Sequence, residues 1–201
     1  MEYVSIDIET TGIDHENNQI LEIGAIVEDT EKIEPFDRLY KFHAIVRHDN
    51  YYGSAYAINL NQRIFNILSV RETCRNDDEI NEYDQKHNIV HVNDIVHKFY
   101  CWLLDCTNHN LNINDQIKII PAGKNFATFD KLFLEKLPDF KKNIKFAHRT
   151  IDPATLYCDF LSDNQLPSSE ECLKRAGYKP IVSHNALKDA WDVIKILRKK
   201  Y

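Results

Sequence analysis

Three features that mark other classes of protein are missing from this 201-residue sequence. No apolar run approaches the roughly 20 residues that a membrane-spanning helix needs, so we expect no membrane span. The five cysteines include no CxxC pair, and their odd number does not suit a disulfide framework. The N-terminus shows no basic segment followed by an apolar stretch, so no secretory signal is evident. Together these absences predict a cytoplasmic protein.

Positive charge is also scarce, with 25 Lys and Arg against 31 Asp and Glu and a formal net charge of −6. Proteins that coat long nucleic acid usually present a basic surface, so extended, sequence-independent binding is not expected. Two bound divalent cations would add four positive charges, moving −6 to about −2 and making one acidic cleft locally positive. This balance fits a phosphate-bearing ligand or a chain end better than a long duplex.

Internal repeats and Gly/Ser/Pro-rich linkers are absent too, so we expect one domain over residues 1–201. Apolar alternation predicts strands over residues 3–9, 19–28, 39–46, 117–120 and 145–152. Helical spacing predicts helices over residues 56–68, 95–103, 125–137, 156–161, 168–177 and 185–199. The acidic segment 69–88 is predicted to be a solvated loop or a surface helix. This order predicts an α/β fold whose mixed sheet is antiparallel at first and parallel later.

Two acids, Asp7 and Glu9, stand on the first predicted strand, opposite the face that carries its branched apolar residues. At about 3.3 Å per residue their Cα atoms lie roughly 7 Å apart on one face. Carboxylates this close repel each other unless a positive charge lies between them. Either the face is simply solvated, or the two acids bind a hard cation such as Mg²⁺ or Mn²⁺. These two residues alone support both interpretations equally.

Further candidates lie near the C-terminal half of the chain, and each also has an ordinary interpretation. Asp130 falls in the strongly apolar segment N-F-A-T-F-D-K-L-F-L, where it could be an exposed helix position. His184 precedes the last predicted helix, where a histidine is more often a capping or surface residue than a catalyst. Asp189 lies in that helix as a potentially solvated acid, and Asp192, one turn later, is a competing candidate.

Taken together, three segments resemble the motifs of the DEDDh 3′–5′ exonucleases, and they appear in family order. They are D-I-E-T-T-G (7–12), N-F-A-T-F-D (125–130) and H-N-A-L-K-D (184–189). The family includes the proofreading subunit of bacterial replicative polymerase, ribonuclease T and oligoribonuclease. Lesser similarities are found in L-E-I-G-A (21–25), A-x-x-x-N (57–61) and R-T-I-D-P (149–153).

The resemblance implies a ribonuclease H-like fold, a five-stranded mixed sheet flanked by helices, with two divalent ions, Mg²⁺ or Mn²⁺, in its active site. It implies these site residues: Asp7, Glu9, Asp130 and Asp189 as metal ligands, with Asp7 and Glu9 also catalytic, His184 as general base, and Thr10, Gly12 and Asn125 as substrate-binding residues. Asp192 matches no motif position.

The implied function is hydrolysis of single-stranded DNA or RNA, or of short oligonucleotides, from the 3′ end to nucleoside 5′-monophosphates. One alternative is a catalytically silent relative that binds nucleic-acid ends or a partner protein, although such relatives are expected to lack one of the five residues. A plain α/β interaction module would need three motifs to coincide by chance. The residues do not distinguish DNA from RNA, and a homodimer, known for ribonuclease T and oligoribonuclease, stays open.

Overall fold

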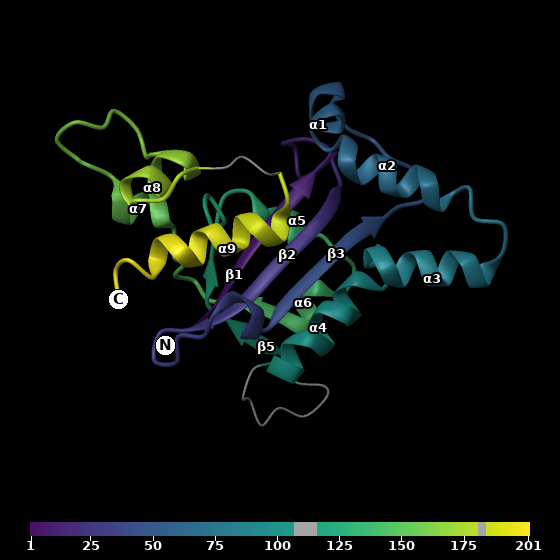
Figure 1. Cartoon of the computed structure of the whole chain (residues 1–201), viewed down its shortest axis with the longest axis horizontal. Coiled ribbons are helices and arrows are strands. Elements are labelled where there is room, and N and C mark those ends of the chain that lie inside the picture. The colour runs from purple at the N-terminus through teal and green to yellow at the C-terminus, as the bar shows by residue number, and fades with distance from the viewer. Residues whose placement is uncertain (107–115, 181–183) are drawn as a thin grey trace.

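A five-stranded mixed sheet with the strand order β4-β3-β2-β1-β6 forms the centre of the computed structural model, which describes residues 1–106, 116–180 and 184–201 (Figure 1). Its antiparallel part consists of three long strands, β1 (Glu2–Thr10), β2 (Ile20–Asp29) and β3 (Lys41–Arg47). Two short strands extend it in parallel, β4 (Ile89–His91) beside β3 and β6 (Pro121–Ala122) beside β1. The predicted five-stranded mixed sheet is confirmed.

The segment predicted as one strand over residues 117–120 divides between two sheets. β5 (Ile117–Ile119) pairs in parallel with β7 (Ile144–Phe146) in a separate two-stranded sheet. The chain then crosses to β1, where the carbonyl of Ile120 accepts the N–H of Val4 at 2.9 Å, and continues as β6. The strand predicted over residues 145–152 is shorter in the structure, where it is β7. After β7 only an isolated bridge joins Ile151 to Ala122.

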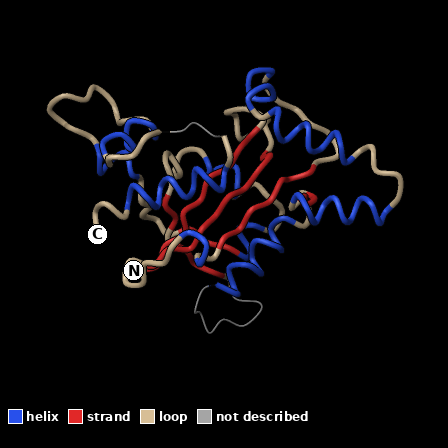
Figure 2. The backbone as a smooth tube through the Cα atoms, in the orientation of Figure 1, coloured by secondary structure: helices blue, strands red, loops and turns tan. Residues whose placement is uncertain are grey.

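Helices lie on both faces of the sheet (Figure 2). Their bounds are α1 (Ala55–Leu60), α2 (Gln62–Arg71), α3 (Asp77–His87), α4 (Ile95–Cys106), α5 (Asp130–Leu134), α6 (Phe140–Asn143), α7 (Pro153–Tyr157), α8 (Ser169–Arg175) and α9 (Ala186–Leu197), with a 3-10 turn η1 (Phe36–Arg38). The acidic segment contains the surface helix α3, which buries none of its residues. Among the described helices, none combines the length and apolar character needed to cross a bilayer.

Two predicted helices were placed wrongly. The helix expected over residues 125–137 is only α5, because Asn125 takes a left-handed conformation (φ +58°) and begins a series of turns. These turns still bury Phe126. The spacing from Phe126 to the buried Phe133 of α5 therefore resembles that of one continuous helix. The helix expected over residues 156–161 instead begins at Pro153, since the Asp152 side chain caps it by accepting the N–H of Ala154. The predicted cap of α8 is confirmed, with Ser168 accepting the N–H of Glu171.

The two faces of β1 pack against different layers. Val4, Ile6 and Ile8 belong to the main core, which α4 covers. On the opposite face Tyr3 packs in a second cluster with residues of α9, and Ser5 Oγ donates to the carbonyl of Ala190 at 2.8 Å. The face that carries the acids is therefore covered along its first half by α9, and its acidic half lies beside the first turn of that helix.

Candidate active site

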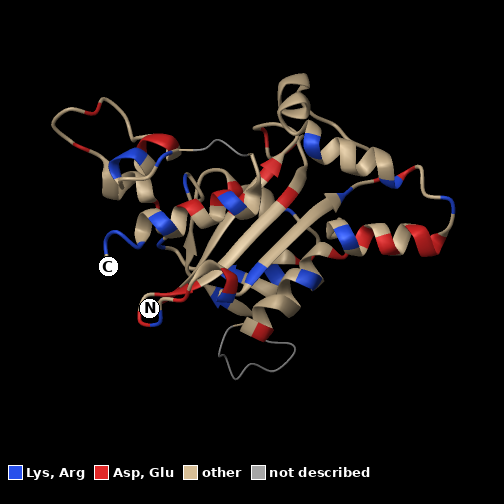
Figure 3. Ribbon diagram, in the orientation of Figure 1, with Lys and Arg blue, Asp and Glu red and all other residues tan. Residues whose placement is uncertain are grey.

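Three of the four predicted metal ligands meet where β1 passes the start of α9. One carboxylate oxygen from each of Asp7, Glu9 and Asp189 lies within 4.8 Å of the corresponding oxygens of the other two. Asp7 and Glu9 share a face because they are two residues apart on β1, and α9 crosses that face with Asp189 in its first turn. Figure 3 shows acidic residues on β1, β2 and α9 in this region.

Asp130 lies beside this group but makes a different contact. Its side chain is 3% exposed, so the interpretation as an exposed helix position is wrong. Its Oδ1 accepts the backbone N–H of Ile8 at 3.2 Å. Ile8 lies beyond the part of β1 that pairs with β6, because β6 pairs only with Val4 and Ser5. The structure thus joins Asp130 to the residue between Asp7 and Glu9, outside the three-carboxylate group.

The electrostatics of these acids are those of crowded, desolvated carboxylates. Burial raises the pKa of Asp7 well above its usual value, and the charges of Asp130 and Asp189 raise it further. Burial, followed by the charge of Asp189, raises the pKa of Glu9 to about 7. Burial likewise raises the pKa of Asp130 to about 7. Within the described part of the chain, no Lys or Arg forms an ion pair with Asp7 or Glu9. Hard oxygen donors under this mutual repulsion fit Mg²⁺ or Mn²⁺.

His184 stands at the entrance to the same region. Its backbone is left-handed (φ +43°), its side chain is exposed, and it lines a cleft of about 390 Å³ together with Asp7, Asp189 and Lys124. The helix cap is supplied by the next residue, because the Asn185 side chain accepts the N–H of Lys188 at 3.0 Å. Capping therefore does not account for His184.

The competing acid Asp192 lies one turn further along α9. It lines the same cleft, but it is buried and forms an ion pair with Lys195. It does not belong to the three-carboxylate group.

The predicted substrate-binding residues have local structural roles. Thr10 Oγ1 donates to the carbonyl of Gly12 at 2.7 Å. A Cβ at Gly12 would lie 2.2 Å from Asn18 Oδ1, so a larger residue in this turn would displace the Asn18 side chain. Asn125 is exposed, and its N–H donates to Asp152 at 2.9 Å. A role for these three residues in binding substrate stays a prediction.

One further acid, Glu22, was not singled out as a site residue in the sequence. It is completely buried on β2, directly opposite Glu9 in the strand register. The signal was present, since a lone acid within the apolar run I-L-E-I-G-A-I-V must find partners if it is buried.

No family model and no curated protein matches this sequence. Solved structures do match: Exonuclease I of E. coli with a 5cy-dT13 oligonucleotide (TM-score 0.59, 12% identity) and cell-death related nuclease 4 (TM-score 0.58, 13% identity). The fold is ribonuclease H-like. A third match is a moderately thermophilic Exonuclease I from Methylocaldum szegediense (TM-score 0.58, 12% identity).

Each of these matches covers 98% of the present chain. The chain spans only 40% of the two Exonuclease I chains and 62% of the cell-death related nuclease. At these identities the likeness establishes the fold, and the expectation of a ribonuclease H-like fold is confirmed. The chemistry has to be argued from the residues at the site.

Proposed function

We propose that this protein is a 3′–5′ exonuclease that uses two divalent metal ions to shorten single-stranded DNA or RNA. The observation that carries the proposal is the meeting of Asp7, Glu9 and Asp189 within 4.8 Å, beside a cleft that Asp7 and Asp189 line together with His184. This arrangement lies in a fold shared with exonucleases, one of which has been solved with a thirteen-nucleotide oligothymidylate.

Mg²⁺ or Mn²⁺ is the cofactor that the donor set fits, because every candidate ligand is a carboxylate oxygen. Asp7, Glu9 and Asp189 would hold one ion, and Asp130, adjacent to Asp7, would support the second. When bound, such ions supply an activated water and neutralise charge on the leaving oxygen. Burial of the carboxylates strengthens their interaction with a cation, because the local dielectric constant is lower than in water.

His184 is the residue best placed to take the proton of the attacking water. Its exposed imidazole shares the cleft with Asp7 and Asp189, and no other histidine lines that cleft within the described residues. A water oxygen forms the new bond to phosphorus, the bond from phosphorus to the 3′ oxygen breaks, and that oxygen takes up a proton. The phosphate stays on the released residue, so the product is a nucleoside 5′-monophosphate.

The substrate is proposed to be a chain end rather than the interior of a long duplex. The cleft of about 390 Å³ is in the range of small-ligand sites. The net charge of −6 disfavours the broad phosphate contacts that hold long nucleic acid.

Digestion of single-stranded DNA and RNA labelled at the 5′ end tests this proposal, in Mg²⁺, in Mn²⁺ and in EDTA. We expect stepwise shortening from the 3′ end, only with metal, and strong inhibition by a 3′-phosphate. Loss of a residue that only supports a metal ligand typically lowers activity roughly 10–100-fold. Asp7→Asn removes a proposed ligand itself, so its activity should fall by more than this. In EDTA this variant should be at least as stable as the wild type, because a repelling charge is removed.

Three results would contradict the proposal. Degradation of circular single strands at an equal rate would exclude an obligate exonuclease. Binding of oligonucleotide ends without cleavage in either metal would favour the catalytically silent relative. Near-wild-type turnover of Asp7→Asn would remove the carboxylate group from the chemistry.

A further inference from the structure

The buried carboxylate of Glu22 accepts contacts from three elements, β3, α2 and the N-terminal end of α9. Its Oε1 is 2.6 Å from His43 Nε2 on β3, and its Oε2 accepts Arg63 Nη2 of α2 at 2.7 Å. Oε2 also accepts the backbone N–H of Ala186, the first residue of α9, at 3.1 Å. Asn185, the cap of α9, approaches Oε1 with its amide nitrogen at 3.4 Å. Glu22 therefore binds the N-terminal end of α9, where a negative charge is favoured by the helix dipole.

β2 also lies against α9 two residues further along the strand, at Gly24. A Cβ at Gly24 would lie 2.2 Å from the backbone carbon of Ala186 and from the nitrogen of Leu187. The first turn of α9 thus rests directly on the backbone of β2. Glu22 fixes this turn along the strand, and Gly24 allows the contact.

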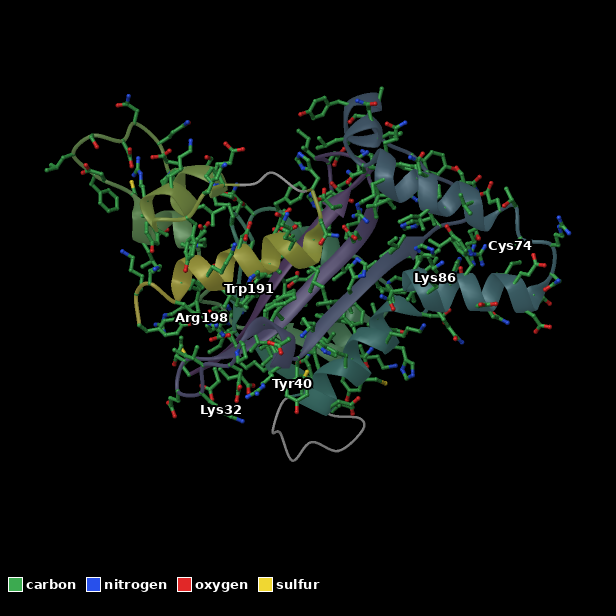
Figure 4. The ribbon with its side chains drawn as sticks, viewed as in Figure 1. Lys32, Tyr40, Cys74, Lys86, Trp191 and Arg198 are labelled. Atoms are coloured by element: carbon green, nitrogen blue, oxygen red, sulfur yellow. The ribbon has the colours of Figure 1, made fainter. Side chains whose placement is uncertain are left out.

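A second buried glutamate on the same strand provides a comparison. Glu28 is also completely buried, and it accepts Arg198 Nε at 3.0 Å and Nη2 at 2.7 Å. Arg198 follows the last turn of α9, so Glu28 binds the opposite end of the helix. Figure 4 labels Arg198 and Trp191, and the guanidinium carbon of Arg198 lies 5.1 Å from the centre of the Trp191 ring.

We propose that Glu22 is a positioning residue for the carboxylate site: by holding the first turn of α9 against β2, it keeps Asp189 within reach of Asp7 and Glu9. This inference rests on the proposed function, since it assigns Glu22 to a metal site. Asp189 lies three residues after Ala186, in the same turn. Any shift of that turn therefore moves the Asp189 carboxylate relative to the two acids on β1.

Arg63 and His43 keep the Glu22 side chain in place. Burial disfavours the charged form of Glu22, but hydrogen bonds from His43 and Arg63 more than offset this effect, and its pKa lies below the usual value. A charged carboxylate accepts a stronger hydrogen bond from the Ala186 N–H than a neutral acid would. The Arg63 side chain is 42% exposed, so one of the two side chains that hold Glu22 lies at the protein surface.

Two conservative substitutions with the same charge test the inference. Glu22→Asp keeps the charge but shortens the side chain by one carbon–carbon bond, roughly 1.5 Å. Glu28→Asp makes the same change at the other end of α9. Because both variants keep the net charge, a difference in metal affinity cannot come from a change in net charge. Isothermal titration with Mn²⁺ gives the affinity, and hydrogen exchange gives the protection of the Ala186 amide.

We expect Glu22→Asp to bind Mn²⁺ roughly 10–100-fold more weakly and to lose protection at Ala186. Glu28→Asp should keep wild-type Mn²⁺ affinity and lose protection only near Arg198. If Glu22→Asp does not fold, Arg63→Lys replaces it, with Arg198→Lys as its control. Arg63 is partly exposed, and its charge is kept, so a smaller weakening in the same direction is expected.

The inference is overturned if Glu22→Asp, or Arg63→Lys in its place, binds Mn²⁺ within about threefold of its control. A wild-type protein that binds no Mn²⁺ overturns it as well. Neither measurement requires cleavage of a substrate. Wild-type protein that binds Mn²⁺ but cuts no nucleic acid would therefore contradict the proposed exonuclease activity. The positioning role of Glu22 would still be tested by the Mn²⁺ affinities of the variants.

Discussion

The two ends of α9 contact the same strand through the same kind of side chain but differ in charge balance. At the C-terminal end the Glu28 carboxylate is matched by the Arg198 guanidinium and also accepts the Tyr201 hydroxyl. At the N-terminal end Glu22 accepts hydrogen bonds from both Arg63 and His43, while Asp7 and Glu9 lie beside it on β1. The C-terminal end is electrostatically complete, whereas the N-terminal end holds more carboxyl groups than cationic partners.

This difference separates a structural use of buried acids from a functional one. A buried pair with two well-directed hydrogen bonds can stabilise a helix end without further chemistry. A group of carboxylates whose pKa values are raised by burial and by one another lowers the stability of the metal-free protein, and a bound cation restores it. Excess buried charge of this kind is therefore a better indicator of a site than the number of acids. The exposed acidic helix α3 shows the contrast, because water solvates its charges.

The largest expected effect is the loss of the exposed imidazole at the N-terminal end. Asn tolerates the left-handed backbone at position 184, so His184→Asn removes the ring with little strain. General-base catalysis is typically worth about 10²–10⁴-fold, and we expect the single-turnover rate to fall by that factor. Mn²⁺ affinity and melting temperature should not change, because the carboxylates remain.

The exposed His148, which lies outside this cleft, supplies the control. His148→Asn should retain the wild-type rate. A rate for His184→Asn within about threefold of the wild type would remove His184 from the mechanism, whatever the effect on binding.

A smaller effect is expected in the stability of the metal-free protein. The folded-state pKa values of Glu9 and Asp130 are raised to about 7 from the ordinary values of 4.5 and 3.8 for these side chains. Between about pH 4 and pH 7 the native state then binds more protons than the unfolded state, so stability falls as pH rises. In the folded state Asp163, whose pKa is lowered to about 2, titrates below this window.

Urea midpoints measured in EDTA from pH 4 to pH 8 test this sign. The midpoint should decrease across the window in the wild type and decrease less steeply in Glu9→Gln. Saturating Mn²⁺ should raise the midpoint most at the upper end, since the cation binds the ionised carboxylates. A Glu9→Gln profile parallel to that of the wild type would show that Glu9 is not a cause of the slope.

The sequence was sufficient to predict the three long antiparallel strands, whereas β4 was missed and the strands predicted over residues 117–120 and 145–152 correspond to β5 and β7 of the separate two-stranded sheet. Period-two alternation from Val4 to Ile8 predicts which face of β1 enters the main core, and the structure agrees. The spacing of Asp7 and Glu9 predicts a shared face from strand geometry alone. The approach of Asp189 to these two acids could not be derived from local spacing, because it depends on how α9 crosses the sheet. Its expected role came from the resemblance of three motifs.

Other features required tertiary information. The helix expected over residues 125–137 depended on the spacing of phenylalanines, but the left-handed Asn125 and the turns after it place Phe126 in the core without a helix. The role of Glu22 depends on partners from β3, α2 and α9 that only the folded chain brings together. An acid in an apolar run predicts that partners exist but does not identify them.

The smallest expected effect is a steric one at the N-terminal end of α9. In Gly24→Ala the added methyl group would lie 2.2 Å from backbone atoms of Ala186 and Leu187, so the first turn of the helix must shift away from β2. Overpacking of this kind typically costs about 1–3 kcal/mol of stability. Because the shift also moves Asp189, we expect weaker Mn²⁺ binding.

Leu197→Ala, at the buried C-terminal end, is the control and should cost about 2–5 kcal/mol through a cavity without weakening Mn²⁺ binding. Chemical denaturation and Mn²⁺ titration of both variants would separate the two ends. If the less stable variant, Leu197→Ala, also binds Mn²⁺ more weakly, metal affinity follows global stability and the two ends of α9 do not differ in function.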